Sequence, residues 1–133
     1  YTATEYGPAL MNGEPIRASN RSSLDGAHLR MSKSYLAQDH WHRPPPDLRR
    51  SFRSSIAYRL CLIAEGAYDG MISTRDAWEW DIAAGSLIAA RAGAGVSDRL
   101  GAPLRFNAPG AKTAGIFAAA PMVHQGILRD LKQ

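Results

Sequence analysis

The stretch that decides the fold is Trp78-Glu79-Trp80-Asp81-Ile82-Ala83-Ala84-Gly85. It places one carboxylate, Asp81, after two indoles and before a run of small and branched apolar residues that continues to Ala90. A helix that is apolar on nearly all sides is enclosed by other layers of a protein. We therefore expect a buried helix here, and we expect its entrance to be the place where a polar side chain can do chemistry.

The preceding segment, residues 53–66, has the periodicity of a second helix. Ile56, Leu60 and Ile63 form one apolar stripe at a period of 3.6 residues. Ser54 or Ser55 can cap the start of this helix, since a serine hydroxyl accepts hydrogen bonds from free backbone N–H groups.

Strand patterns alternate with these helices along the chain. Residues expected in strands are 28–32, 68–73, 96–98 and 115–120, and a closing helix begins at Pro121. The first 18 residues predict a hairpin with strands at 1–6 and 15–18, because Asn-Gly dipeptides favour such turns. Alternating helices and strands make the fold class α/β.

Composition and charge exclude several classes of protein. The chain has 133 residues, of which 45% are hydrophobic and 21% charged, as in a globular domain. The net charge is +4, but the basic residues form no stripe interleaved with aromatic residues, so specific nucleic-acid binding is not expected. No apolar run is long enough to span a membrane. Cys61 is the one cysteine, which favours a reducing, cytoplasmic location.

Two histidines, His40 and His42, stand beside Asp39 and shortly before three prolines. The cluster is open to two interpretations, a metal site or a surface loop. A surface loop is favoured, because no second group of ligands is apparent and such segments before prolines are typical of loops.

Four stretches of the chain resemble one known family. Residues 80–85 followed by 92–98 resemble the C-terminal signature of the inositol monophosphatase family. Residues 1–16, the helix start at 54–61 and the turn at 64–70 match further parts of its pattern in the same order. Ser32-Lys33-Ser34 and the run 57–61 are most similar to bacterial 3′(2′),5′-bisphosphate nucleotidases.

The resemblance implies a layered α/β/α/β/α sandwich, of which this chain is the C-terminal portion. Residues 1–20 would be a hairpin at the end of a missing N-terminal sheet, and residues 21–133 the C-terminal α/β domain. The partners expected are that missing N-terminal half, a phosphorylated small molecule and, as an outlet for exposed apolar surface, a second copy of the chain.

The resemblance also implies a Mg²⁺-dependent phosphomonoesterase. Asp81 matches a metal ligand of the family. Metal ions in such enzymes lower the pKa of bound water and neutralise phosphate charge. The residues expected to contact substrate are Ser54, Ser55, Thr74, Arg75, Asp76 and Lys33.

The remaining metal ligands of the family, a Glu pair and an Asp-Pro-x-Asp-Gly-Thr segment, have no counterpart in this sequence. The chain alone is therefore expected to be inactive. The preferred substrate is adenosine 3′,5′-bisphosphate, which would lose its 3′-phosphate. The alternatives are an inositol or sugar phosphate, or an inactive folded fragment that self-associates. Without the family pattern, Asp81 would be interpreted as a helix cap. Glu79 is expected to be a first-turn charge, and Trp78 and Trp80 are expected to pack.

Overall fold

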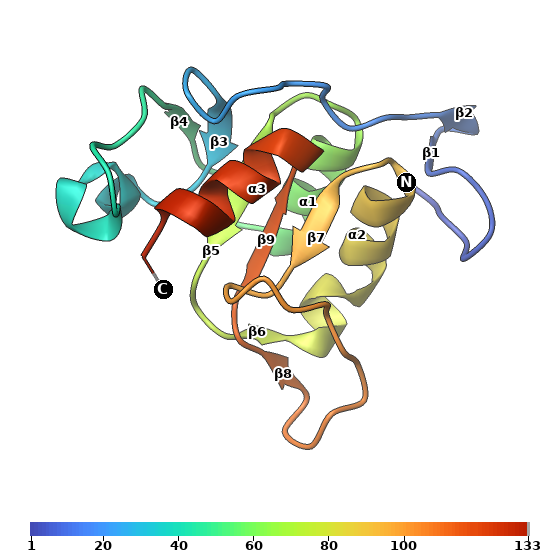
Figure 1. Cartoon of the computed structure of the whole chain (residues 1–133). Coiled ribbons are helices and arrows are strands. Elements are labelled where there is room, and N and C mark those ends of the chain that lie inside the picture. The colour runs from blue at the N-terminus through green and yellow to red at the C-terminus, as the bar shows by residue number, and fades with distance from the viewer. Residues whose placement is uncertain (133) are drawn as a thin grey trace.

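A five-stranded sheet forms the centre of the computed structural model, which describes residues 1–132 (Figure 1). Its strands are β3 (His28–Arg30), β4 (Arg49–Ser51), β5 (Gly70–Ser73), β7 (Gly95–Ser97) and β9 (Ile116–Ala119). They lie in the order β4-β3-β5-β9-β7. The sequence predicted all of these strands except β4, whose three residues carry two arginines and lack the apolar pattern of a buried strand.

Four of the five strands point in one direction. β3 pairs in parallel with both β4 and β5, whereas β9 is antiparallel to both β5 and β7. Helix α1 (Ile56–Ala64) runs back from β4 to β5, and helix α2 (Glu79–Arg91) runs back toward β7. The carboxyl ends of β3, β4 and β5 therefore meet at the same edge of the sheet as the N-termini of α1 and α2.

Helices cover the two faces of the sheet unequally (Figure 1). Helix α3 (Pro121–Asp130) lies on one face, and α1 and α2 lie together on the other. Because successive side chains of a strand point to opposite faces, Met71 packs with the residues of α1 and α2, and Ile72 packs with those of α3. The predicted helix at 53–66 and the closing helix from Pro121 are confirmed, and so is the α/β fold class.

The expectation that the Asp81 helix is enclosed on nearly all sides is wrong in this structure. Ile82, Gly85 and Ala89 are buried toward α1 and the sheet. Trp80 is 67% exposed and Leu87 is 40% exposed on the other side. The reason is that the sheet covers one side of α2, and none of the described residues forms a layer on the other.

The N-terminal segment forms a smaller hairpin than expected. Strands β1 (Leu10–Met11) and β2 (Glu14–Pro15) flank Asn12 and Gly13, whose φ angles of 51° and 85° confirm the Asn-Gly turn. The predicted strand at 1–6 is wrong, because only Thr2 pairs, in a single bridge to Leu10.

The hairpin lies against the ends of α1 and α2. Ala9 is fully buried beside Ala64 and Ala89, and Arg91 Nε donates to the backbone oxygen of Gly7 at 2.6 Å. The hairpin is thus packed onto the helices and does not extend the main sheet.

The segment around His40 and His42 is an irregular surface loop, as expected, but it contains a core residue. Two short 3₁₀ turns, η1 (Lys33–Leu36) and η2 (Gln38–His40), lead into Trp41, which is 1% exposed. Its indole Nε1 donates to the backbone oxygen of Tyr35 at 2.7 Å. No group of three or more metal-binding side chains occurs among residues 1–132, so this structure supports no metal site at these histidines.

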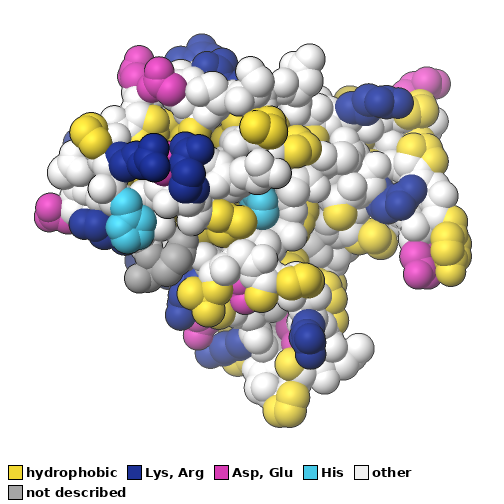
Figure 2. Space-filling model, viewed as in Figure 1, with side chains coloured by type: hydrophobic (Ala, Val, Ile, Leu, Met, Phe, Trp, Pro, Cys, Tyr) yellow, Lys and Arg dark blue, Asp and Glu magenta, His cyan; other side chains and the backbone are white. Residues whose placement is uncertain are grey.

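On the α3 face, Lys and Arg side chains lie in small groups separated by other residues (Figure 2). This face carries no continuous basic stripe of the kind that tracks a nucleic-acid backbone. No helix in the described part of the chain is both long and apolar enough to cross a bilayer.

Candidate active site at the carboxyl ends of the parallel strands

A cavity of about 420 Å³ opens at the edge where β3, β4 and β5 end. Ligands of α/β proteins commonly bind outside the carboxyl ends of strands, where the loops diverge. The residues that line it are Ser32, Ser34, Tyr35, Phe52, Ser54, Arg59, Ile72, Ser73, Thr74 and Arg75. Three of the expected substrate contacts, Ser54, Thr74 and Arg75, therefore share one cavity.

The two serines before α1 have different positions. Ser55 is the N-cap of α1, and its hydroxyl oxygen accepts a hydrogen bond from the backbone N–H of Tyr58 at 3.2 Å. Ser54, one residue earlier, lines the cavity. The capping role of Ser55 orients the start of the helix, where free N–H groups and the helix dipole favour an anion.

The loop after β5 holds Thr74, Arg75 and Asp76. The Thr74 hydroxyl is hydrogen-bonded to the hydroxyl of Tyr35, and the Thr74 backbone oxygen accepts from Arg99. Arg99 Nη1 also lies 3.2 Å from Asp76 Oδ1. Asp76 is thus engaged in an ion pair that holds the loop, whereas Arg75 faces the cavity.

Lys33 begins η1 and is exposed. Its neighbours Ser32 and Ser34 line the cavity, although Lys33 itself does not. The lysine therefore lies at the margin of the site.

Asp81 lies in the first turn of α2 and does not line this cavity. Trp78 is the N-cap residue of the helix, so Asp81 is not the cap. Within residues 1–132 the Asp81 carboxylate makes no hydrogen bond or ion pair, and it is exposed to solvent. An exposed carboxylate without a partner is available as a ligand.

The residues of this chain do not fit a complete magnesium site. Mg²⁺ takes about six oxygen ligands, of which the protein commonly supplies one or two carboxylates. The described residues contain no group of three or more His, Cys, Asp or Glu side chains that could hold a metal ion. Asp81 can therefore supply one ligand, and the chain by itself does not assemble a two-metal centre.

Glu79 has a structural role that the sequence did not indicate. Its side chain is 8% exposed, and its two carboxylate oxygens accept hydrogen bonds from the backbone N–H groups of Asn107 (2.7 Å) and Ala108 (3.0 Å). These bonds fasten the long loop between β7 and β8 (Lys112–Thr113) to the start of α2.

We expect Glu79→Gln to lower the free energy of unfolding by about 1–2 kcal/mol, because one of two charge-assisted hydrogen bonds is lost. Denaturant unfolding measures this change. Glu14→Gln, the same substitution at an exposed position of β2, is the control and should leave stability within about 0.5 kcal/mol of the original. Equal effects of the two substitutions would contradict the role of Glu79.

The two indoles pack against each other and are not part of the core. Trp78 lies in the short strand β6 (Ala77–Trp78), and its ring stacks on that of Trp80 with centroids 4.6 Å apart. Lys112 Nζ lies 4.1 Å from the Trp78 ring centroid, and Trp78 remains 41% exposed. The two rings thus pack on each other, but both remain exposed and neither enters the core.

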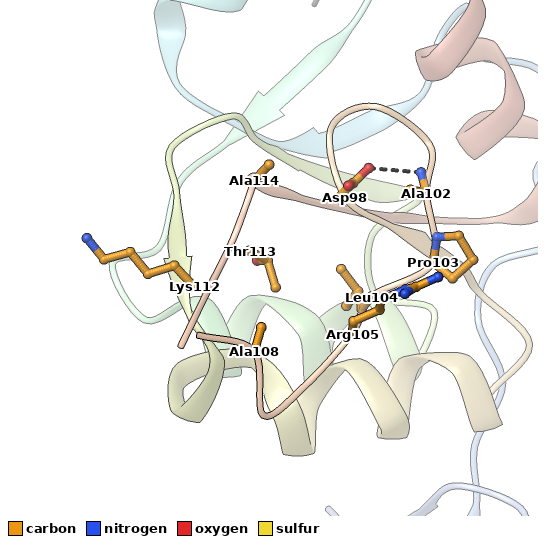
Figure 3. A pocket seen from close by; sticks show the side chains of 9 residues that line it. All are labelled: Asp98, Ala102, Pro103, Leu104, Arg105, Ala108, Lys112, Thr113 and Ala114. Carbon is orange, nitrogen blue, oxygen red and sulfur yellow. Dashed lines mark hydrogen bonds between the residues drawn. The ribbon is translucent and has the colours of Figure 1, made fainter. Parts of the chain in front are cut away.

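A second, smaller cavity of about 220 Å³ lies under the loop that Glu79 fastens (Figure 3). Asp98 is the only carboxylate among the residues lining it, and this side chain accepts from the backbone N–H groups of Leu100 and Ala102, both at 2.8 Å. Because Asp98 closes its own loop, this cavity offers no free carboxylate for chemistry.

Sequence reasoning missed two arginines beside the larger cavity. Arg59 lines it, and burial lowers the pKa of its guanidinium, with the positive charge of Arg30 as the second cause. Arg30, the last residue of β3, is 1% exposed and does not itself line the cavity. The alternation of residues 28–32 could have indicated Arg30, because an arginine between two apolar residues of a central strand must point into one of the layers.

Comparison with known proteins identifies the family. The model of the inositol monophosphatase family matches residues 1–133. The chain belongs to this family. Nus factor SuhB of Pseudomonas aeruginosa is 31% identical over 124 aligned positions, which cover 76% of this chain and 41% of SuhB.

Solved structures of the family share the fold. Staphylococcal IMPase-II with bound inositol monophosphate has a TM-score of 0.77 at 20% identity, over 95% of this chain and 50% of that one. Thermotoga maritima IMPase has a TM-score of 0.75 at 24% identity, over 95% and 48%. The chain thus spans about half of these structures and 41% of SuhB.

Proposed function

We propose that this chain is the substrate-side half of a Mg²⁺-dependent phosphomonoesterase. The observation that supports this best is the cavity at the carboxyl ends of β3, β4 and β5, which gathers Ser54 from the segment after β4 and Thr74 and Arg75 from the loop after β5. Asp81 would hold one metal ion from the N-terminus of α2. When bound, Mg²⁺ would neutralise phosphate charge and lower the pKa of a bound water.

In this proposal the chain's own residues bind and orient the substrate. The start of α1, shaped by the Ser55 cap, favours an anionic group. Arg75 and the marginal Lys33 add positive charge, and Asp76 keeps the Thr74 loop in place through Arg99. The hydroxyls of Ser54 and Thr74 can donate hydrogen bonds to phosphate or sugar oxygens.

We propose adenosine 3′,5′-bisphosphate as the substrate, with loss of its 3′-phosphate. Several basic and hydroxyl side chains in or beside one cavity suit a ligand with two phosphates better than one with a single phosphate. A nucleotide is compatible with the fold, since Staphylococcal IMPase-II has also been solved with bound 2′-AMP, at a TM-score of 0.75. The alternative is an inositol phosphate, as in the other complex of that protein.

The rest of the metal centre is proposed to come from a second α/β half that packs on the outer side of α1 and α2. Trp80 and Leu87 are exposed there, and Tyr58 of α1 is 46% exposed. The division into a hairpin at 1–20 and a domain at 21–133 belongs to this proposal. A second copy of the chain on the same face is the alternative occupant.

Phosphate release in the presence of Mg²⁺ tests the proposal. We expect the 133-residue chain alone to release none above background. The chain fused behind the unmatched N-terminal part of SuhB should hydrolyse adenosine 3′,5′-bisphosphate with kcat/KM at least about 10-fold above inositol 1-phosphate, which corresponds to about 1.4 kcal/mol of transition-state discrimination. Preference for inositol 1-phosphate would overturn the choice of substrate, and full activity of the chain alone would overturn its role as half of a site.

A further inference from the structure

Two arginines lie inside this protein without a counter-ion. The Nε and Nη1 atoms of Arg30 and the Nε atom of Arg59 are buried, and none of the three has a hydrogen-bond partner among residues 1–132. An arginine stays charged at all physiological pH values. Burying an unpaired charge is strongly unfavourable, so such groups are normally paired in native proteins. The two side chains therefore carry buried donor atoms that an anion could satisfy.

Arg59 lines the cavity, and Arg30 lies behind this wall, near enough for its positive charge to lower the pKa of Arg59. Leu29 and Met31 pack on the α3 side of the sheet, so Arg30, between them, points to the α1 side. Its Cζ atom lies 3.5 Å from the ring centroid of Tyr68, which holds the guanidinium in place. Arg59 projects from the second turn of α1 into the cavity of about 420 Å³.

No ion pair within residues 1–132 involves Arg30 or Arg59. Asp69 is the nearest acidic residue along the chain to Tyr68, and its two oxygens accept from the Ser19 hydroxyl and from the backbone N–H of His28. The ion pairs present within residues 1–132 involve other arginines, namely Arg21, Arg43, Arg99 and Arg129. A negatively charged ligand could supply the charge that these ion pairs leave uncompensated.

The donors around the cavity indicate the shape of the ligand. Guanidinium groups match the oxygens of phosphate and sulfate with pairs of parallel hydrogen bonds. The hydroxyls of Ser54 and Ser73 line the same cavity and can donate to further oxygens. We propose that Arg30 and Arg59 bind a tetrahedral dianion of the phosphate or sulfate class, either as a free ion or as the phosphoryl group of a larger molecule.

This site requires neither a metal nor hydrolysis. Asp81 does not line the cavity, and its negative charge would repel an anion when no metal is bound. The inference deepens the proposed function, on which its choice of cavity rests, and binding measured in EDTA tests the arginines separately from metal-dependent hydrolysis.

Anion binding to the purified chain in EDTA tests the inference. Sodium sulfate and inorganic phosphate should each raise the thermal midpoint more than sodium chloride of the same ionic strength, and titration calorimetry should give a saturable Kd. Arg30→Met should weaken sulfate binding by at least about 10-fold, since one bidentate partner is lost. In chloride alone the same variant should melt no lower than the original, because an unpaired buried charge has been removed.

The matched control is Arg49→Met, the same substitution on the exposed surface of the neighbouring strand β4, which should keep the original affinity. If Arg30→Met does not fold, Arg59→Met carries the test, because Arg59 is only half-buried on α1. A midpoint equal in sulfate and chloride would overturn the inference, and so would an arginine variant that keeps the original affinity.

Comparison of adenosine 5′-monophosphate with inorganic phosphate separates the possible sources of the anion. Adenosine 5′-monophosphate that binds in EDTA with a Kd close to that of inorganic phosphate would show that the cavity takes a phosphoryl group carried by a nucleotide. Inorganic phosphate binding without nucleotide binding would assign the cavity to the free ion. Either result supports the arginine site, whereas binding of neither ligand contradicts it.

Discussion

Replacing Asp81 by asparagine is expected to reduce Mg²⁺-dependent phosphate release by at least about 100-fold in the fusion with the N-terminal part of SuhB. An amide carries no negative charge and binds Mg²⁺ more weakly than a carboxylate does. Because the Asp81 side chain has no partner within residues 1–132, the fold should be affected little. Loss of a favourable charge at the α2 N-terminus costs about 0.3–1 kcal/mol.

Activity and stability, measured together, distinguish a metal ligand from a residue that only supports the fold. Phosphate release gives kcat and KM as a function of Mg²⁺ concentration, and denaturant unfolding of the 133-residue chain gives stability. Asp39→Asn, at an exposed aspartate within η2, is the matched control and should leave both unchanged. Retention of full activity by Asp81→Asn would rule out the metal-ligand role.

Replacing Gly85 by valine is expected to lower the free energy of unfolding by about 2–3 kcal/mol. A Cβ atom at position 85 would lie 2.8 Å from Leu60 Cδ1 and 3.0 Å from Leu60 Cβ, and 3.5 Å from the backbone oxygen of Ala57. Leu60 is fully buried in the contact between α1 and the sheet, so it has little room to move. The two helices would have to separate, which would disturb the edge where Ser55 and Asp81 lie.

Thermal or denaturant unfolding measures the effect, which corresponds to a fall in Tm of roughly 5–10 °C for a domain of this size. Ala84→Val, one position earlier on the exposed surface of α2, introduces the same side chain without the contact. It should cost less than about 1 kcal/mol, the range of helix propensities. A loss of stability at position 85 no larger than that at position 84 would contradict the close helix packing.

Local patterns were enough to predict most elements of the fold. The stripe of Ile56, Leu60 and Ile63 and the proline at position 121 indicated α1 and α3, because these signals depend on residues within one or two turns. The Asn12-Gly13 turn was predictable for the same reason. Strand β4 was not, since Arg49 and Arg50 carry no apolar signal and pair only because β3 lies beside them.

The candidate site was likewise predictable only in part from the sequence. The resemblance of residues 80–85 and 92–98 to a family signature indicated Asp81, and the family is now shown, but its role as a metal ligand remains a prediction. The shared cavity of Ser54, Thr74 and Arg75 depends on loops that follow different strands, and no local pattern reports which loops converge.

The sequence by itself determined the α/β class, the two helix starts and the family, because periodicity, capping residues and motif spacing are properties of neighbouring residues. Only the tertiary structure decided that one side of α2 is exposed, that Glu79 is fastened to the loop at 107–108, and that Arg30 and Arg59 lack a counter-ion. Burial and charge pairing are set by which distant segments lie together, and this is fixed only when the layers pack.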